Sequence, residues 1–223
     1  MSTATSTTPR RHFLGGIAAA TAALALGRWS PANAASLGDA LAPTDFDESW
    51  IGRIKGKHKQ VFDCVSSNDG FGAAFALNFI DSYKQAHKLN DKDLTAVVSL
   101  RHMAMPLTLS DAIWSKYHIG EVIGVNDPNT KAPATRNPFR DAIMMRPGLT
   151  YEQLIADRGV IMTACNMALG ALSGMAASKA GVSADVAAKE WTAGLLPGVV
   201  LVPSGVYAVN RAQEAGCTYC FGG

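Results

Sequence analysis

A cysteine stands where the chain passes from an apolar run to a stretch with helical character. The run 159–164 ends directly before Cys165, and Asn166 opens a segment rich in small residues. A thiol at a helix N-terminus meets the positive end of the helix dipole, which favours the nucleophilic thiolate. Cys165 is therefore the first catalytic candidate. The structural alternative is a small buried residue at the end of a strand.

Arg101 and His102 form the second candidate group, because they directly follow the apolar run 94–100. An imidazole at such a position can tune a thiol, shuttle a proton or ligate a metal. A hydrogen-bonded structural histidine is the plainer interpretation. Arg101 can hold an anion, or it can be a solvated surface residue. We take His102 as a catalytic candidate and Arg101 as a ligand-binding one.

Polar residues also follow the other apolar runs. The carboxyl ends of parallel strands gather at one edge of a sheet, and ligands of such proteins bind beyond that edge. Residues that follow each run are therefore expected to converge there. The further ligand-binding candidates chosen in this way are Ser66, Asn68, Asn166 and Ser204.

The remaining cysteines are Cys64, Cys217 and Cys220. Cys217 and Cys220 have the C-x-x-C spacing of redox pairs, although a reactive pair normally opens a helix. We assign them as a disulfide or redox pair, with a local disulfide as the simplest interpretation. No histidine follows Cys220, which excludes the c-type haem motif, and a single C-x-x-C is a weak zinc signal. Cys64, like Cys165, is also consistent with a buried free thiol.

Methionines near His102 suggest copper as an alternative ligand, because thioether and thiolate groups suit Cu(I). The methionines concerned are Met103, Met105, Met144, Met145, Met162 and Met167. Met162 and Met167 fall in apolar runs, where core packing explains them, and we assign no metal ligand. The sequence contains no G-x-S-x-G, Walker, G-x-G-x-x-G or H-E-x-x-H motif. It therefore gives no support for common hydrolases, nucleotide-binding proteins or zincins, and no cofactor is assigned.

Apolar runs alternate with segments of helical spacing, and this alternation predicts the elements that position the candidates. Strands are expected over 59–66, 94–100, 121–125, 159–164 and 199–202, with a short edge strand over 217–221. Helices are expected over 71–86, 109–117, 151–157, 166–180, 184–195 and 205–215. Their expected caps are Ser110 or Asp111, Thr150, Ser183 and Ser204.

Continuous apolar strands between helices indicate a parallel sheet that is covered on both faces. The predicted fold is therefore a three-layer α/β/α sandwich with a mainly parallel sheet of about five strands. The segment 126–148 contains four prolines. It is expected to be a long loop, and loops of this length usually have a function.

Residues 1–34 have the composition of an export signal. Arg10-Arg11 precedes the weakly apolar stretch 15–27, and Ala32-Asn33-Ala34 follows as a small-residue cleavage site; this is the layout of a secretory signal. The arginine pair followed by Phe13-Leu14 resembles the bacterial twin-arginine signal. The stretch is too short to span a membrane. We predict a cleaved signal peptide and a periplasmic protein; the alternative is an uncleaved N-terminal anchor.

The mature chain is close to neutral. The whole sequence has 20 Lys and Arg against 18 Asp and Glu, and three of the arginines fall within residues 1–34. With 17 basic and 18 acidic residues left, no basic patch argues for nucleic acid. No later apolar run is long enough to cross a membrane. We therefore expect no membrane-spanning segment after signal cleavage. One domain is expected over 57–223, behind an N-terminal arm over 35–56 whose large anchor is Trp50.

Two segments resemble the DsrE/DsrF-like family. Residues 159–166 (Gly-Val-Ile-Met-Thr-Ala-Cys-Asn) are similar to its strand–cysteine turn, and residues 196–206 with 211–214 are similar to its closing strand and helix. An exported subgroup of the family shares Leu100-Arg101-His102, Trp114-Ser115-Lys116-Tyr117 and Asn137-Pro138-Phe139. The resemblance covers about residues 57–219.

The resemblance implies a small α/β/α domain that forms homo-oligomers and a cysteine that carries sulfur as a persulfide between proteins. Cys165 is the residue that matches this role. We therefore expect a periplasmic DsrE-like protein with sulfur (persulfide) or thiol chemistry at Cys165, and a sulfur-carrier or redox protein as its partner. The alternative is a non-catalytic periplasmic protein in which the segment 126–148 covers a small ligand or a metal such as copper.

Overall fold

The computed structural model describes residues 46–143 and 146–223. The predicted signal over 1–34, the first part of the predicted arm, and Met144 and Met145 lie outside the described residues. Within those residues, no helix is long and apolar enough to cross a membrane.

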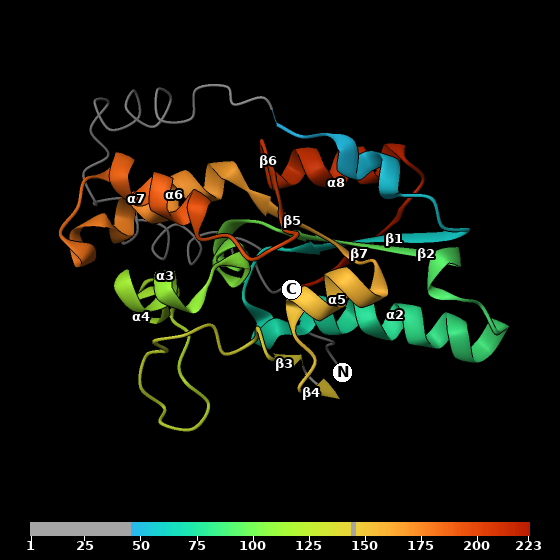
Figure 1. Ribbon diagram of the computed structural model, residues 1–223, viewed down its shortest axis with the longest axis horizontal. Helices are drawn as coiled ribbons and strands as arrows, with labels where there is room; N and C mark the ends of the chain where they lie inside the picture. Colours follow the sequence, from blue (N-terminus) through green and yellow to red (C-terminus); the bar gives the residue numbers. More distant parts are fainter. Residues whose placement is uncertain (1–45, 144–145) are drawn as a thin grey trace, which may run out of the picture. The chain divides into compact units, whose positions relative to one another are not determined.

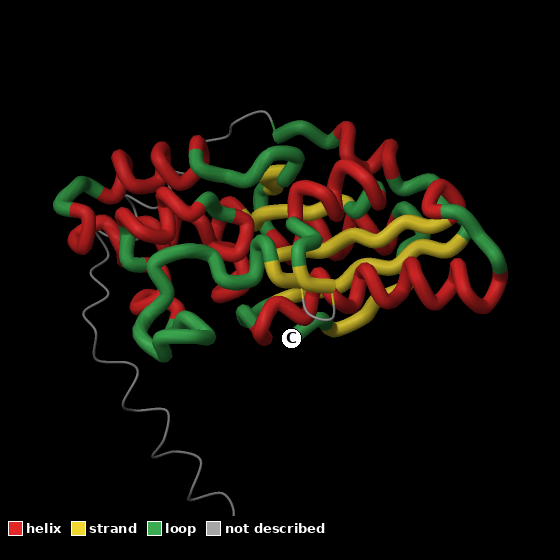
Figure 2. The backbone as a smooth tube through the Cα atoms, turned by 60° about the horizontal axis from the view of Figure 1, so that its bottom comes forward, coloured by secondary structure: helices red, strands yellow, loops and turns green. Residues whose placement is uncertain are grey.

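Five strands form one sheet in the order β6-β5-β2-β1-β7 (Figure 1). They are β1 (His58–Cys64), β2 (Leu94–Leu100), β5 (Ile161–Cys165), β6 (Val200–Val202) and β7 (Thr218–Phe221). Figure 2 shows the strands side by side in yellow. Every pairing in this sheet is parallel, so the carboxyl ends of the strands lie at one edge.

Helices cover both faces of the sheet (Figure 1). One face carries α8 (Gly205–Glu214) and the 3-10 helix η2 (Ser49–Arg53), and the other carries α2 (Phe71–His87) and α5 (Tyr151–Arg158). Every residue of β2 and β5 is buried, which explains why these strands carry no charged residue and are mostly apolar. The predicted three-layer α/β/α fold with a parallel sheet of about five strands is confirmed.

Two buried clusters correspond to the two faces. On the α8 side, Val61 and Val97 pack with Ala208 and Ala212, whose small side chains let α8 lie close to the sheet. The larger cluster lies on the α2 side and includes Phe62, Val98 and Met162 together with residues of α2 and α5.

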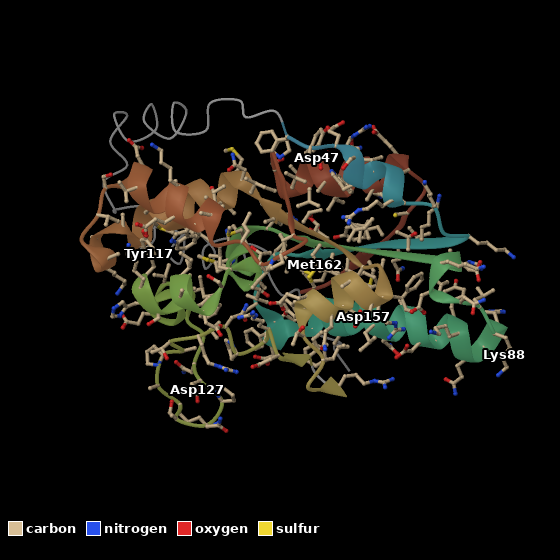
Figure 3. All side chains as sticks on the ribbon, viewed as in Figure 1. Asp47, Lys88, Tyr117, Asp127, Asp157 and Met162 are labelled. Atoms are coloured by element: carbon tan, nitrogen blue, oxygen red, sulfur yellow. The ribbon has the colours of Figure 1, made fainter. Side chains whose placement is uncertain are left out.

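A group of helices continues beyond the carboxyl edge of the sheet. It contains η5 (His102–Thr108), α3 (Asp111–Lys116), α4 (Ile119–Ile123), α6 (Asn166–Ala176), η6 (Ala177–Ala180) and α7 (Ala184–Ala193). Trp114, Tyr117 and Trp191 are fully buried among these helices. Figure 3 labels Tyr117 in this group and Met162 in the sheet.

Most of the predicted helix caps are confirmed. Thr150 accepts a hydrogen bond from the N–H of Gln153, whose side chain accepts one from the N–H of Thr150. Ser183 accepts from the N–H of Val186 before α7, and Ser204 accepts from the N–H of Tyr207 before α8. Ser110 is the residue before α3, but its side chain makes no cap hydrogen bond.

The predicted strand over 121–125 is wrong, because α4 occupies this region and ends at Gly124 in a left-handed conformation. A short apolar run has too little length for its periodicity to separate a strand from a helix. The helix packs closely against the following loop, since a Cβ at Gly120 would overlap the backbone of Ala134. The fifth strand of the sheet is β7, which confirms the predicted edge strand.

The predicted loop 126–148 is largely irregular in its described part. It contains one small antiparallel pair, β3 (Ala142–Ile143) with β4 (Arg146–Pro147). The short 3-10 helices η3 (Asn68–Gly70) and η4 (Asp91–Asp93) lie in the connections around α2.

Trp50 anchors the described part of the arm, and its removal tests that role. Its side chain is 1% exposed and packs beside Val61 and Val97. We expect Trp50→Ala to lower the free energy of unfolding by about 3–5 kcal/mol, because a cavity replaces a buried indole. Urea denaturation followed by circular dichroism measures the change. The control is Gly52→Ala, whose added methyl meets no atom within 4 Å; equal losses in the two variants would contradict the role.

Candidate functional site

A row of buried polar side chains crosses the α8 face of the sheet just before the strands end. Successive residues of a strand point to opposite faces. Since Phe62 belongs to the core on the α2 side, Asp63 points to the α8 side. The strand register places Ser99 beside Asp63 and Thr163 beside Ser99. Asp63 is 5% exposed, and the other two are fully buried.

Arg101, the first residue after β2, forms an ion pair with Asp63. Its Nε donates to Oδ1 at 2.7 Å and its Nη2 to Oδ2 at 3.0 Å. Tyr219 of β7 donates its hydroxyl to the same Oδ2 at 3.1 Å. The side chain of Asp63 is 7% exposed and that of Arg101 is 27% exposed. One buried carboxylate therefore links the ends of β2, β1 and β7.

The start of α8 is fixed against Arg101. A Cβ at Gly205 would overlap the Cβ of Arg101, so a glycine is needed for the helix to begin at this distance from β2. Ser99 donates its hydroxyl to the carbonyl of Gly205 at 3.3 Å. Ser204 accepts from the N–H of Tyr207 at 3.2 Å and caps the helix. The predicted candidates Arg101 and Ser204 are thus brought together.

Cys165 ends β5 and caps α6. Its Sγ accepts a hydrogen bond from the N–H of Ala168 at 3.3 Å, and the residue is 6% exposed. The free N–H groups at a helix start carry partial positive charge, which stabilises negative charge on the sulfur. Asn166, also a predicted candidate, is the first residue of α6 and is half-buried.

The guanidinium of Arg101 acts on the same sulfur. The pKa of Arg101 is raised first by its hydrogen bonds to Asp63, against the effect of burial, and further by the charges of Asp63, Tyr219 and Cys165. The last contribution means that Arg101 and Cys165 are close enough for their charges to interact. The structure therefore combines a capped helix start and a fixed arginine at one cysteine.

His102 does not take part in this group of contacts. It is exposed and opens η5 in a left-handed conformation, with φ of 50°. Within the described residues, no hydrogen bond joins His102 to Cys165. The hydrogen bonds of the described residues thus give His102 no direct role at the thiol.

Ser66 and Asn68 contact the segment that follows β7. The N–H of Ser66 donates to the carbonyl of Gly223 at 3.0 Å, and Nδ2 of Asn68 donates to the carbonyl of Gly222 at 3.0 Å. These two predicted ligand-binding residues therefore lie at the end of β1 and hold the neighbouring edge strand in place.

All four cysteines are free thiols. Cys217 is buried in the α8-side cluster, whereas Cys220 packs against the core on the α2 side. They lie three residues apart on extended chain, so they point to opposite faces, and no disulfide joins them. Burial raises the pKa of Cys64 to about 12 and that of Cys217 to about 11.

The methionines of the copper alternative are dispersed. Met105 and Met162 are fully buried in the core, and Met167 is 54% exposed in the first turn of α6. Within residues 46–143 and 146–223, no group of three or more His, Cys, Asp or Glu side chains is placed to hold a metal ion.

Asp63 and Tyr219 are part of the site but are absent from the sequence prediction. A signal for Asp63 is present, because a carboxylate inside an apolar strand must find a partner once it is buried. Tyr219 carries no comparable signal, since its role depends on the position of β7 beside β1.

The fold and these contacts define a parallel α/β protein with a helix-capping thiol at the carboxyl edge of its sheet. No family model, curated protein or solved structure matches the chain. The resemblance to the DsrE/DsrF-like family therefore stays a prediction.

The ion pair can be tested with Asp63→Asn. We expect this variant to lose about 2–3 kcal/mol of unfolding free energy, because Arg101 keeps its charge and loses a buried carboxylate. Chemical denaturation measures the loss. The matched control is Asp141→Asn, which breaks the exposed pair with Arg136, where the side chains are 45% and 50% exposed. That control should change stability by less than about 1 kcal/mol; a similar small change in Asp63→Asn would refute the role of the buried pair.

Proposed function

We propose that Cys165 is a reactive thiol that carries sulfur as a persulfide or takes part in thiol exchange. The observation that carries the proposal is the hydrogen bond from the N–H of Ala168 to Sγ at the start of α6. Helix caps are normally Ser, Thr, Asp or Asn. A neutral thiol is a weak acceptor, whereas a thiolate is a charged one. A cysteine at this position thus supports chemistry that uses anionic sulfur.

Sulfur transfer needs no external oxidant or reductant. The thiolate of Cys165 attacks the outer sulfur of a donor persulfide, and the donor's S–S bond breaks. The donor leaves as a thiolate and takes up the proton of the transferred sulfur, so Cys165 ends with a terminal sulfur that carries the negative charge. The helix start and Arg101 stabilise the Cys165 thiolate before the transfer and the persulfide anion after it.

Arg101 is a ligand-binding residue in this proposal. Asp63 holds its Nε and Nη2, and Nη1 makes no hydrogen bond to any described residue. The remaining N–H groups are available to an anionic donor. The donor is a sulfur-carrier or redox protein, and assembly into homo-oligomers and location in the periplasm belong to the same proposal. The location rests on the twin-arginine pattern within residues 1–34.

The relative reactivity of the cysteines checks the proposal. A raised pKa leaves less thiolate at a given pH, so Cys64 and Cys217, with pKa values of about 12 and about 11, should resist alkylation at neutral pH. We expect iodoacetamide to modify Cys165 at least about tenfold faster than either of them in the folded protein. Peptide mass mapping over time gives the order. If Cys165 reacts as slowly as Cys64, the thiol is a structural one.

Sulfur loading is the direct test. We expect protein purified from the periplasm to show a reductant-labile mass gain of one sulfur atom, located on Cys165 by peptide mapping. Cys165→Ser should abolish the gain, and Cys220→Ser should keep it. An unmodified and unreactive Cys165 would instead favour the alternative, a non-catalytic protein that binds a small ligand or a metal.

A further inference from the structure

The outer side of β7 presents unpaired backbone groups. β7 lies at the end of the sheet and pairs with β1. The N–H of Gly222 donates to the carbonyl of Asp63 at 2.9 Å. By the alternation of an extended strand, the backbone groups of Cys220 also face β1, whereas those of Tyr219 and Phe221 face away. Within the described part of the chain, no strand pairs with that outer side.

Among the described residues, this edge lacks charges, prolines and a covering element, three of the features that usually prevent strand pairing. Edge strands of natural proteins normally carry charges or prolines, or are covered by other elements. Residues 215–223 include no charged residue and no proline. Tyr219 is 48% exposed and Phe221 is 58% exposed, and both point to the α8 side of the sheet. Open backbone groups and two aromatic rings therefore occur together on one short strand.

We propose that β7 pairs antiparallel with β7 of a second copy of this chain, about a two-fold axis at Cys220. In this register Tyr219 of each copy lies opposite Phe221 of the other, and Cys220 lies opposite its own equivalent. Since the backbone groups of Tyr219 and Phe221 face outward, their cross-strand pairs are the hydrogen-bonded ones. Cys220 then forms the non-hydrogen-bonded pair, in which side chains come closest.

The strand itself argues for a second copy as the occupant. A two-fold axis brings an edge against itself, so the same short sequence must complement itself. β7 complements itself in this register, because Tyr219 of each copy lies opposite Phe221 of the other and no like charges lie opposite each other.

The α2 side of the strand is consistent with the same occupant. A hollow of about 300 Å³ lies there beside Cys220, lined by Phe62, Phe75, Phe79 and Tyr83 among others. An added strand would cover part of this lining with its own Thr218 and Cys220. Four residues per strand form a small interface, so the dimer should depend on protein concentration.

Sedimentation velocity over a concentration series tests the dimer with the full chain. We expect a monomer–dimer equilibrium in which Phe221→Lys raises the dissociation constant at least about tenfold, through loss of both aromatic pairs and added charge at the edge. The control is Val206→Lys, in the first turn of α8, where Val206 is 62% exposed; it should leave the equilibrium unchanged. A monomer at every concentration, or equal effects of the two variants, would overturn the proposal.

Crosslinking checks the register. Diamide accepts two hydrogens from two thiols and leaves one disulfide, so it should join two copies through Cys220. The covalent dimer on a non-reducing gel should disappear in Cys220→Ser and Phe221→Lys and persist in Cys165→Ser. A dimer that survives Cys220→Ser would reject the register. The dimer rests on the homo-oligomer part of the proposed function. Because its readout does not use Cys165, failure of the dimer and failure of the sulfur chemistry are distinguishable.

Discussion

The carboxyl edge of the sheet depends on one buried carboxylate. Asp63 lies in a strand that is otherwise apolar at this point, and its charge is tolerated because Arg101 and Tyr219 donate to it. Removal of a charge from water costs several kcal/mol unless such partners are present. The need to satisfy Asp63 therefore fixes the end of β2, the position of β7 and the path of the Arg101 side chain over Gly205.

The same arginine connects stability with chemistry. Its guanidinium is held by Asp63 and interacts electrostatically with Cys165. The thiol is therefore in a fixed electrostatic environment, set by a residue whose place is determined by the fold. Such preorganisation is less easily achieved on a loop, where a free arginine would sample many conformations.

Much of the fold can be predicted from the sequence because its strands are apolar runs bounded by turns and caps. β1, β2, β5 and β6 follow from these runs, and Thr150, Ser183 and Ser204 mark their helices by hydrogen bonds within a few residues. The strand predicted over 121–125 is wrong because a five-residue apolar run is too short for its periodicity to separate a strand from a helix. In the folded chain Gly120 packs closely against the backbone of Ala134, a contact that the local sequence does not reveal.

The site is predictable only in part, for a related reason. Parallel topology alone brings Arg101, Cys165 and Ser204 to one edge, and the sequence supplies that topology. The partnership of Asp63 with Tyr219 depends on strand order, because it joins residues 156 positions apart in the chain. Likewise, His102 is an expected site residue that has a left-handed backbone and is exposed to solvent, and neither property can be predicted from the apolar run before it.

The pairing of β7 with β1 also has a consequence for the order of folding. Closing the long segment between β1 and β7 costs entropy before any contact is gained. We therefore expect β7 to join a sheet whose other strand pairs are already present. Until then Asp63 has Arg101 but lacks the Tyr219 hydroxyl, and the carboxylate lies at an open side of the sheet. In that order, arrival of β7 is the step that completes the hydrogen bonds of Asp63 and covers its open side.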